Sequence, residues 1–172
     1  MITNFLLDHS WMSPAALVLL VLAGPWVGAW ATNRSRVAWW LLSISLLPVA
    51  LTTLIPTNRV AGAFCTVQWS LPTPGRVELM ANVVLFVAPT LFLTVAIRRP
   101  WLALLGGLAL SASIELAQAL VPAIGRSCDT TDGLTNTIGA AIGAALGWAA
   151  LRIAGRAAVR ADAQRREHTP LR

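Results

Sequence analysis

Charged residues are scarce in this chain, and lysine is missing altogether. Only 12% of the 172 residues are charged, 56% are hydrophobic, and the mean hydropathy is +0.68. A water-soluble domain needs far more charge to cover its surface, so the composition excludes that class and indicates a membrane protein. All 13 basic residues are arginine. We interpret this imbalance as codon bias in a GC-rich genome rather than as chemistry.

The chain has only two histidines, and no glycine-rich phosphate loop is present. His9 and His168 lie near opposite ends of the chain and are predicted on opposite sides of the membrane. Because they cannot share a site, a His-rich zinc centre is excluded and a Ser-His-Asp triad is implausible. We therefore expect no metal and no organic cofactor.

A cleavable signal peptide is not expected, because residues 1–13 lack a basic segment and carry Asp8 and His9. These residues are predicted to form an extracytoplasmic N-terminus. A transmembrane domain is predicted over 14–153, followed by a basic cytoplasmic tail over 154–172. For this tail, contact with anionic lipid is one alternative. The absence of a strong apolar face favours a solvated tail.

Five apolar segments are each close to the roughly 20 residues that a spanning helix needs. The sequence therefore predicts an all-α membrane bundle with spans at 14–32, 37–55, 78–97, 101–121 and 133–153. Pro25, Pro48 and Pro89 fall inside the first three spans, where neighbouring helices can satisfy the freed carbonyls.

Arginine placement predicts that the N-terminus is outside and the C-terminus inside. In that topology three arginines are external: Arg59, Arg76 and Arg126. The other ten are cytoplasmic: Arg34, Arg36, Arg98, Arg99, Arg152, Arg156, Arg160, Arg165, Arg166 and Arg172. Membrane orientation thus accounts for the pI of about 11.5, and we expect no nucleic-acid partner.

Tryptophans gather near the predicted helix ends, as in an interfacial aromatic belt. A tryptophan-lined ligand site is the alternative. Cys65 and Cys128 lie in the two predicted outer loops, which face an oxidising compartment where a disulfide can persist. The sequence does not give their separation, so a bridge and two unrelated thiols both remain open.

Polar side chains recur at helical spacing on the last three predicted spans. Each span places its set on one face: Glu78 with Asn82, Ser111 with Glu115 and Gln118, and Asp132 with Asn136. An ionisable group at membrane depth is costly unless it faces protein or water. We therefore expect these faces to converge near the outer boundary of the membrane.

Small residues follow on the last span, where Gly139, Gly143 and Gly147 form a G-x-x-x-G-x-x-x-G ridge. Such a ridge permits close approach of another helix. We favour a partner helix within the same chain over one in a second copy. The oligomeric state is not predicted.

Three motifs then occur in order. They are N-x-x-L-F-x-x-P at 82–89, I-E-x-x-Q at 114–118, and R-x-x-D-x-x-D-x-x-x-N-x-x-G at 126–139. In order and spacing, over 78–153, the chain resembles the VanZ-like membrane protein family. The cysteine pair is not part of that pattern. The resemblance implies a multi-pass protein of the bacterial plasma membrane, in a family named for an accessory protein of glycopeptide-resistance clusters that is linked to teicoplanin resistance.

The functional hypothesis is a polar pocket at the outer leaflet. Its predicted members are Asn82, Glu115, Gln118, Arg126, Asp129, Asp132 and Asn136. Arg126 could hold a phosphate or carboxylate by its planar fork. The implied ligand is a lipid headgroup, a lipid-linked cell-wall intermediate or a glycopeptide such as teicoplanin. Two alternatives stay open: a membrane enzyme with Glu115 and Asp132 as acid and base, which we favour less, and a purely structural polar network.

Overall fold

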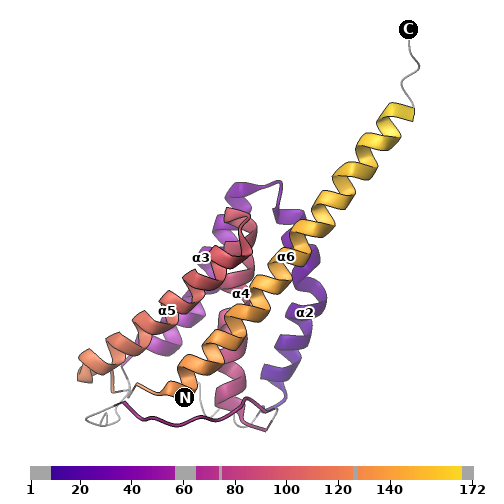
Figure 1. Cartoon of the computed structure of the whole chain (residues 1–172). Coiled ribbons are helices and arrows are strands. Elements are labelled where there is room, and N and C mark those ends of the chain that lie inside the picture. Colours follow the sequence, from indigo (N-terminus) through magenta and orange to yellow (C-terminus); the bar gives the residue numbers. More distant parts are fainter. Residues whose placement is uncertain (1–8, 57–64, 74, 126–127, 168–172) are drawn as a thin grey trace.

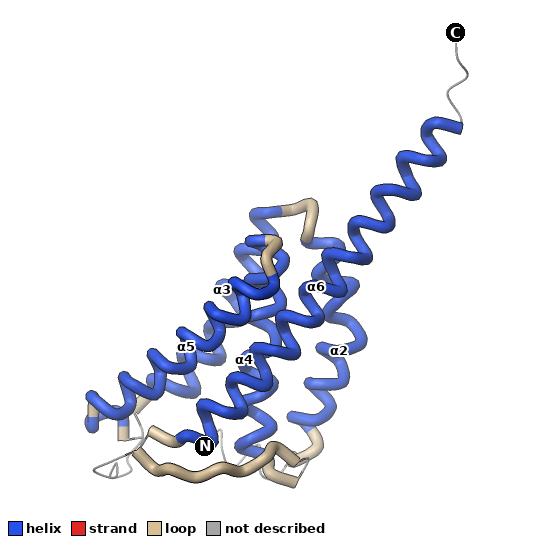
Figure 2. Tube along the Cα trace, viewed as in Figure 1, coloured by secondary structure: helices blue, strands red, loops and turns tan. Residues whose placement is uncertain are grey.

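The computed structural model describes residues 9–56, 65–73, 75–125 and 128–167 (Figure 1). Within these ranges the chain forms long helices joined by loops, with no strand (Figure 2). Their bounds are Met12–Ala31 (α2), Ser35–Leu54 (α3), Val77–Ile97 (α4), Pro100–Leu120 (α5) and Thr130–Glu167 (α6), with a short 3-10 helix, η1, at Pro122–Ile124. All five long helices have the length and apolar composition to cross a membrane. The predicted all-α fold with five spans is confirmed.

Helix α4 forms the centre of the bundle and contacts each of the other four long helices. Its side chains are correspondingly buried: Phe86, Val87 and Leu91 are at most 1% exposed. Pro89 lies inside this helix, as Pro25 and Pro48 lie inside α2 and α3. Surrounding helices exclude lipid from the backbone of α4, which is where a proline inside a span is tolerated.

Helices α4 and α6 approach each other closely, and this approach depends on glycine. A Cβ added at Gly139 would overlap the carbonyl oxygen of Val83, and one at Gly143 would overlap that of Val87. At Gly147 it would come within 2.5 Å of the Cβ of Thr94. The small-residue ridge of α6 therefore packs within the chain, against the backbone of α4.

The outward faces of the bundle are apolar. Leu19 and Leu22 on α2 and Leu47 and Leu51 on α3 are all more than half exposed. Large exposed apolar side chains of this kind suit lipid contact, because acyl chains are as apolar as leucine.

The two ends of the bundle differ. We call one the polar end; it comprises the 65–73 segment, the start of α4, the end of α5 and the first turns of α6 (Figure 1). We call the other the arginine end; it comprises residues 32–34, residues 98–99 and the part of α6 beyond Ala150. There the Arg98 guanidinium donates to the Thr32 carbonyl over 2.9 Å and so joins the two connections.

Helix α6 continues past the predicted end of its span at residue 153 and reaches Glu167. Its 38 residues extend about 57 Å at 1.5 Å per residue, against about 30 Å of hydrocarbon. Alanine and arginine, both strong helix formers, dominate the added length. Residues 154–167 of the basic segment are thus a helical continuation of the span that projects from the bundle (Figure 1).

Candidate functional site

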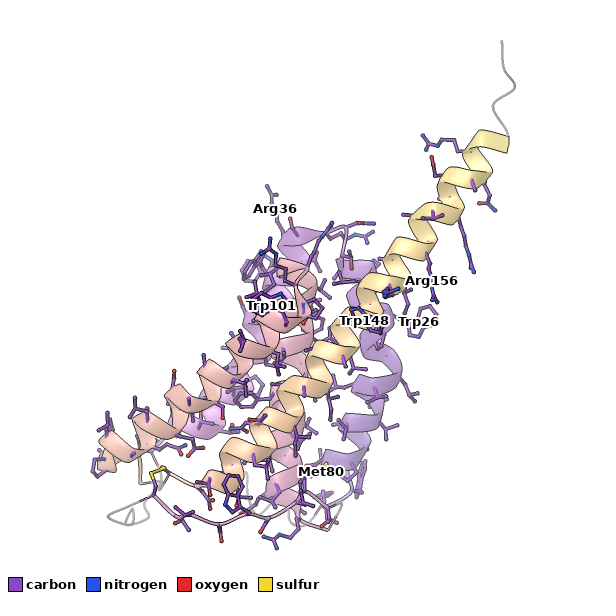
Figure 3. All side chains as sticks on the ribbon, in the orientation of Figure 1. Trp26, Arg36, Met80, Trp101, Trp148 and Arg156 are labelled. Atoms are coloured by element: carbon purple, nitrogen blue, oxygen red, sulfur yellow. A yellow bond between two sulfur atoms is a disulfide. The ribbon has the colours of Figure 1, made fainter. Side chains whose placement is uncertain are left out.

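A disulfide and several hydrogen bonds hold the polar end together. Cys65 and Cys128 form a disulfide, with their Cα atoms 4.6 Å apart, drawn as the yellow bond in Figure 3. Beside it, the Thr66 amide donates to the Cys128 carbonyl over 2.9 Å, and the Thr130 amide donates to the Thr66 carbonyl over 3.1 Å. The 65–73 segment is therefore fixed to the chain immediately before α6, although the two lie more than 60 residues apart.

Gln68 in this segment reaches the start of α6 with both its backbone and its side chain. Its carbonyl accepts hydrogen bonds from the hydroxyls of Thr130, over 2.6 Å, and Thr131, over 2.9 Å. Its side-chain amide donates to Asp129 Oδ2 over 2.6 Å. Gln68 is exposed, so this contact lies at the surface of the polar end.

Asp129 caps helix α6. Its Oδ1 accepts from the Thr131 amide over 2.8 Å, which satisfies one of the free donors of the first turn. Asp129, Asp132 and Glu115 all bring carboxylates to this N-terminus, where the helix dipole favours negative charge. Part of the acidic character of the cluster thus has a structural cause that the motif did not reveal.

Glu115 lies on α5 and faces this cluster. Its Oε2 accepts from the Asp129 amide over 2.9 Å, and its carboxylate lies within electrostatic range of Asp132 and Asp129. Among the described residues this is its only hydrogen bond. An ionised carboxylate can accept about four hydrogen bonds. The described residues therefore use only a small part of the acceptor capacity of half-buried Glu115.

Asn82 on α4 completes the cluster. Its side-chain amide donates to Asp132 Oδ1 over 2.8 Å, across 50 residues of sequence. Helices α4, α5 and α6 thus each contribute a polar side chain: Asn82, Glu115 and Asp132. We call these three residues with Asp129 the carboxylate cluster.

Two predicted pocket residues bond elsewhere. The amide of Asn136 donates to the hydroxyl of Ser111 over 3.1 Å, one turn deeper in the bundle, where both side chains are at most 4% exposed. Gln118 is also buried, but it donates to the Thr53 carbonyl near the end of α3 over 3.3 Å. Ser111, Glu115 and Gln118 share a helix face, but each therefore bonds to a different partner.

Arg126 lies outside the described residues. The chain leading to it ends in η1 and Gly125, whose φ of 67° is a left-handed conformation that glycine adopts readily. Glu78 shares a helix face with Asn82, but its side chain is exposed and outside the hydrogen bonds of the carboxylate cluster.

Sequence reasoning missed Gln68, Thr66, Thr130 and Thr131. A signal existed for the threonines, because the run D-T-T-D directly before an apolar segment is typical of a helix N-terminus. Nothing in the sequence singled out Gln68, whose partners lie more than 60 residues away.

The fold and the polar cluster define a helical protein of the multi-pass membrane class. Within that class, a family model described as VanZ/LLP1 matches residues 11–152. The chain belongs to the VanZ/LLP1 family. No curated protein and no solved structure matches the sequence.

Proposed function

We propose that this protein is an accessory factor of the bacterial plasma membrane that binds the polar headgroup of an amphiphile at the carboxylate cluster. The observation that carries the proposal is Glu115, half-buried at the end of a span and engaged, among the described residues, by a single backbone donor. A carboxylate with spare acceptor sites, beside two further carboxylates, suits a ligand that presents ammonium, amide or hydroxyl groups.

Three ligand classes share this chemistry: a phospholipid headgroup, a lipid-linked cell-wall intermediate and a glycopeptide such as teicoplanin. Each joins hydrogen-bond donors to a lipid chain or lipid anchor, and the cluster lies at the end of the spans where such a headgroup would sit. We propose that Arg126 takes an anionic group of the same ligand by its guanidinium fork.

The proposed orientation places the polar end outside and the arginine end inside. Two observations support it. Of the described arginines, nine belong to the arginine end or its flanks, and only Arg76 belongs to the polar end. The disulfide also lies at the polar end, and disulfides persist in oxidising compartments.

Thiol labelling of intact cells tests the orientation, since Ser10 and Ala161 are both exposed and lie toward opposite ends. We expect Ser10→Cys to react with an impermeant maleimide in intact cells, and Ala161→Cys only after permeabilisation. Labelling of Ala161→Cys in intact cells would show that the orientation is the opposite of the one proposed.

Mass spectrometry of co-purified lipid tests the binding site. We expect one lipid to be enriched with the purified protein relative to bulk membrane, and its enrichment to fall about tenfold in Glu115→Gln, which loses a charge-assisted contact. Glu78→Gln is the matched control, because Glu78 is an exposed carboxylate at the same end. Teicoplanin binding is measured on the same three proteins by calorimetry.

A functional site requires that Glu115→Gln reduce either lipid enrichment or teicoplanin binding while Glu78→Gln leaves both unchanged. Equal retention of lipid and teicoplanin by all three proteins, at equal thermal stability, would assign the cluster to packing alone. Turnover of a lipid-linked substrate by the purified protein would instead establish the enzymatic alternative, with Glu115 and Asp132 as acid and base.

A further inference from the structure

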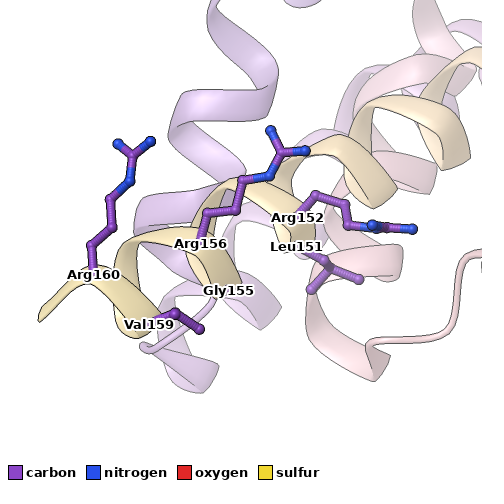
Figure 4. A pocket seen from close by; sticks show the side chains of 6 residues that line it. All are labelled: Leu151, Arg152, Gly155, Arg156, Val159 and Arg160. Carbon is purple, nitrogen blue, oxygen red and sulfur yellow. The ribbon is translucent and has the colours of Figure 1, made fainter. Parts of the chain in front are cut away.

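The part of α6 that projects from the arginine end carries an open groove. It is lined by Leu151, Arg152, Gly155, Arg156, Val159 and Arg160 (Figure 4). The arginines recur every four residues and therefore lie along one face of the helix, with an apolar side chain beside each end of the groove. Nothing lies within 4 Å of the position that a Cβ would take at Gly155, so the floor of the groove is open.

The groove lies at the level where a membrane surface is expected. All eight tryptophans are exposed, and six of them belong to the helix segments near the arginine end: Trp26, Trp30, Trp39, Trp40, Trp101 and Trp148. Tryptophan is enriched at the membrane interface, so these residues mark its depth. Figure 3 shows Trp148 on α6 ahead of Arg156, on the bundle side of the groove.

The arginine side chains of the groove are long enough for their guanidinium groups to reach the depth of the lipid phosphates. Arg156 lies eight residues beyond Trp148, or about 12 Å along the axis, and helix tilt reduces its height above the interface. Helical side chains also lean toward the N-terminus of their helix, which here is toward the bundle. The guanidinium of Arg152 already lies over the Trp148 ring, 4.7 Å from its centroid.

We propose that this groove is a binding site for the phosphate group of an anionic phospholipid in the leaflet at the arginine end. Arg152 and Arg156 hold the phosphate oxygens by their guanidinium forks, and Leu151 and Val159 contact the glycerol and upper acyl carbons. Gly155 leaves room for the headgroup between the two arginines. This site is separate from the carboxylate cluster and does not depend on the proposed function.

The test is native mass spectrometry of the full chain in detergent, with phosphatidylglycerol and phosphatidylcholine in equal amounts. The natural protein is expected to retain phosphatidylglycerol preferentially. A basic residue near an anionic surface changes affinity by about fivefold, so Arg152→Gln with Arg156→Gln should lower the preference by at least about tenfold. Both side chains are exposed, so the double variant should fold normally.

The matched control removes the same charge at the same end. Arg36 and Arg99 are exposed and lie outside the groove, so the double variant Arg36→Gln with Arg99→Gln should keep the preference. A second variant tests the shape of the groove: Gly155→Leu fills its floor without changing charge and should also abolish the preference.

Three results would overturn the site. Equal losses in the two arginine pairs would mean that only overall charge matters. An unchanged preference in Gly155→Leu would show that no groove is used. Displacement of phosphatidylglycerol by an equal concentration of inorganic phosphate would identify a site for the free anion instead of a lipid site.

Discussion

The polar end and the arginine end are stabilised by interactions of different range. At the polar end the disulfide and the bonds of Gln68 and Asn82 join residues 50 or more positions apart. At the arginine end most contacts are local: Arg34 donates to the Trp30 carbonyl and covers its ring, and Arg152 covers Trp148. Partition of arginine and tryptophan to the interface needs no tertiary partner, whereas a buried carboxylate does.

The two ends also differ in how much their side chains contribute to packing. At the arginine end the arginine and tryptophan side chains are exposed, and we expect their replacement to cost little packing. At the polar end the capping role of Asp129 and the bond between Asn82 and Asp132 contribute to packing, while Glu115 accepts only one hydrogen bond from the described residues. Substitutions should therefore cost stability at the polar end and leave it nearly unchanged at the arginine end.

The largest contrast is expected between two glycines of the same helix. Gly139→Ala should lower the free energy of unfolding by about 2–3 kcal/mol, because the new methyl overlaps the Val83 carbonyl and forces α4 and α6 apart. The methyl group of Gly155→Ala enters open space, so this variant should leave the free energy of unfolding unchanged or raise it by up to about 1 kcal/mol. Unfolding in mixed micelles, followed by circular dichroism, measures both. Equal effects would contradict the close approach.

Loss of the disulfide comes next. Replacing Cys65 and Cys128 by serine should lower the free energy of unfolding by about 2 kcal/mol, at the lower end of the usual range, because α4 and α5 stay helical in the membrane and shorten the effective loop. Reductant should destabilise the natural protein equally and leave the serine variant unchanged. Alkylation of both thiols in membranes prepared without reductant would contradict the bridge.

A smaller effect is expected for the bond between Asn82 and Asp132. A double-mutant cycle with Asn82→Ala and Asp132→Ala should give a coupling of about 0.6 kcal/mol, the average for hydrogen bonds between spanning helices. The control cycle pairs Asp132→Ala with Glu78→Ala and should be additive. Zero coupling in the first cycle would show that the bond between Asn82 and Asp132 does not contribute to stability.

The smallest effect belongs to the arginine end. Arg152→Gln should lower the free energy of unfolding by about 0.5 kcal/mol through loss of its contact with the Trp148 ring. Arg156→Gln, with no such ring contact among the described residues, should have no effect. A loss above about 2 kcal/mol for either would place these side chains in the packing of the bundle and end the contrast between the two ends.

Much of the fold followed from the sequence. Composition and five apolar runs were enough for the membrane class and the all-α bundle, because transfer into lipid depends on each run separately. The span ends agreed within a few residues except in α6, where the helix continues through Gly155, and alanine and arginine extend it to Glu167.

The candidate site followed only in part. Spacing put Asn82, Glu115 and Asp132 on helix faces, and the cost of charge in lipid predicted that those faces meet. Spacing gave no information on the separate partners of Gln118 and Asn136, or on Gln68. Those depend on how the helices rotate and pack.

The sequence alone determined which segments enter the membrane and which end collects arginine and tryptophan, since both depend on local composition. The tertiary structure alone decided that α4 receives the glycine ridge, that the 65–73 segment is tied to the start of α6, and that Glu115 faces Asp129. The reason is that hydrogen bonds and close backbone contacts are short-ranged, so their partners are defined only once distant parts of the chain have packed together.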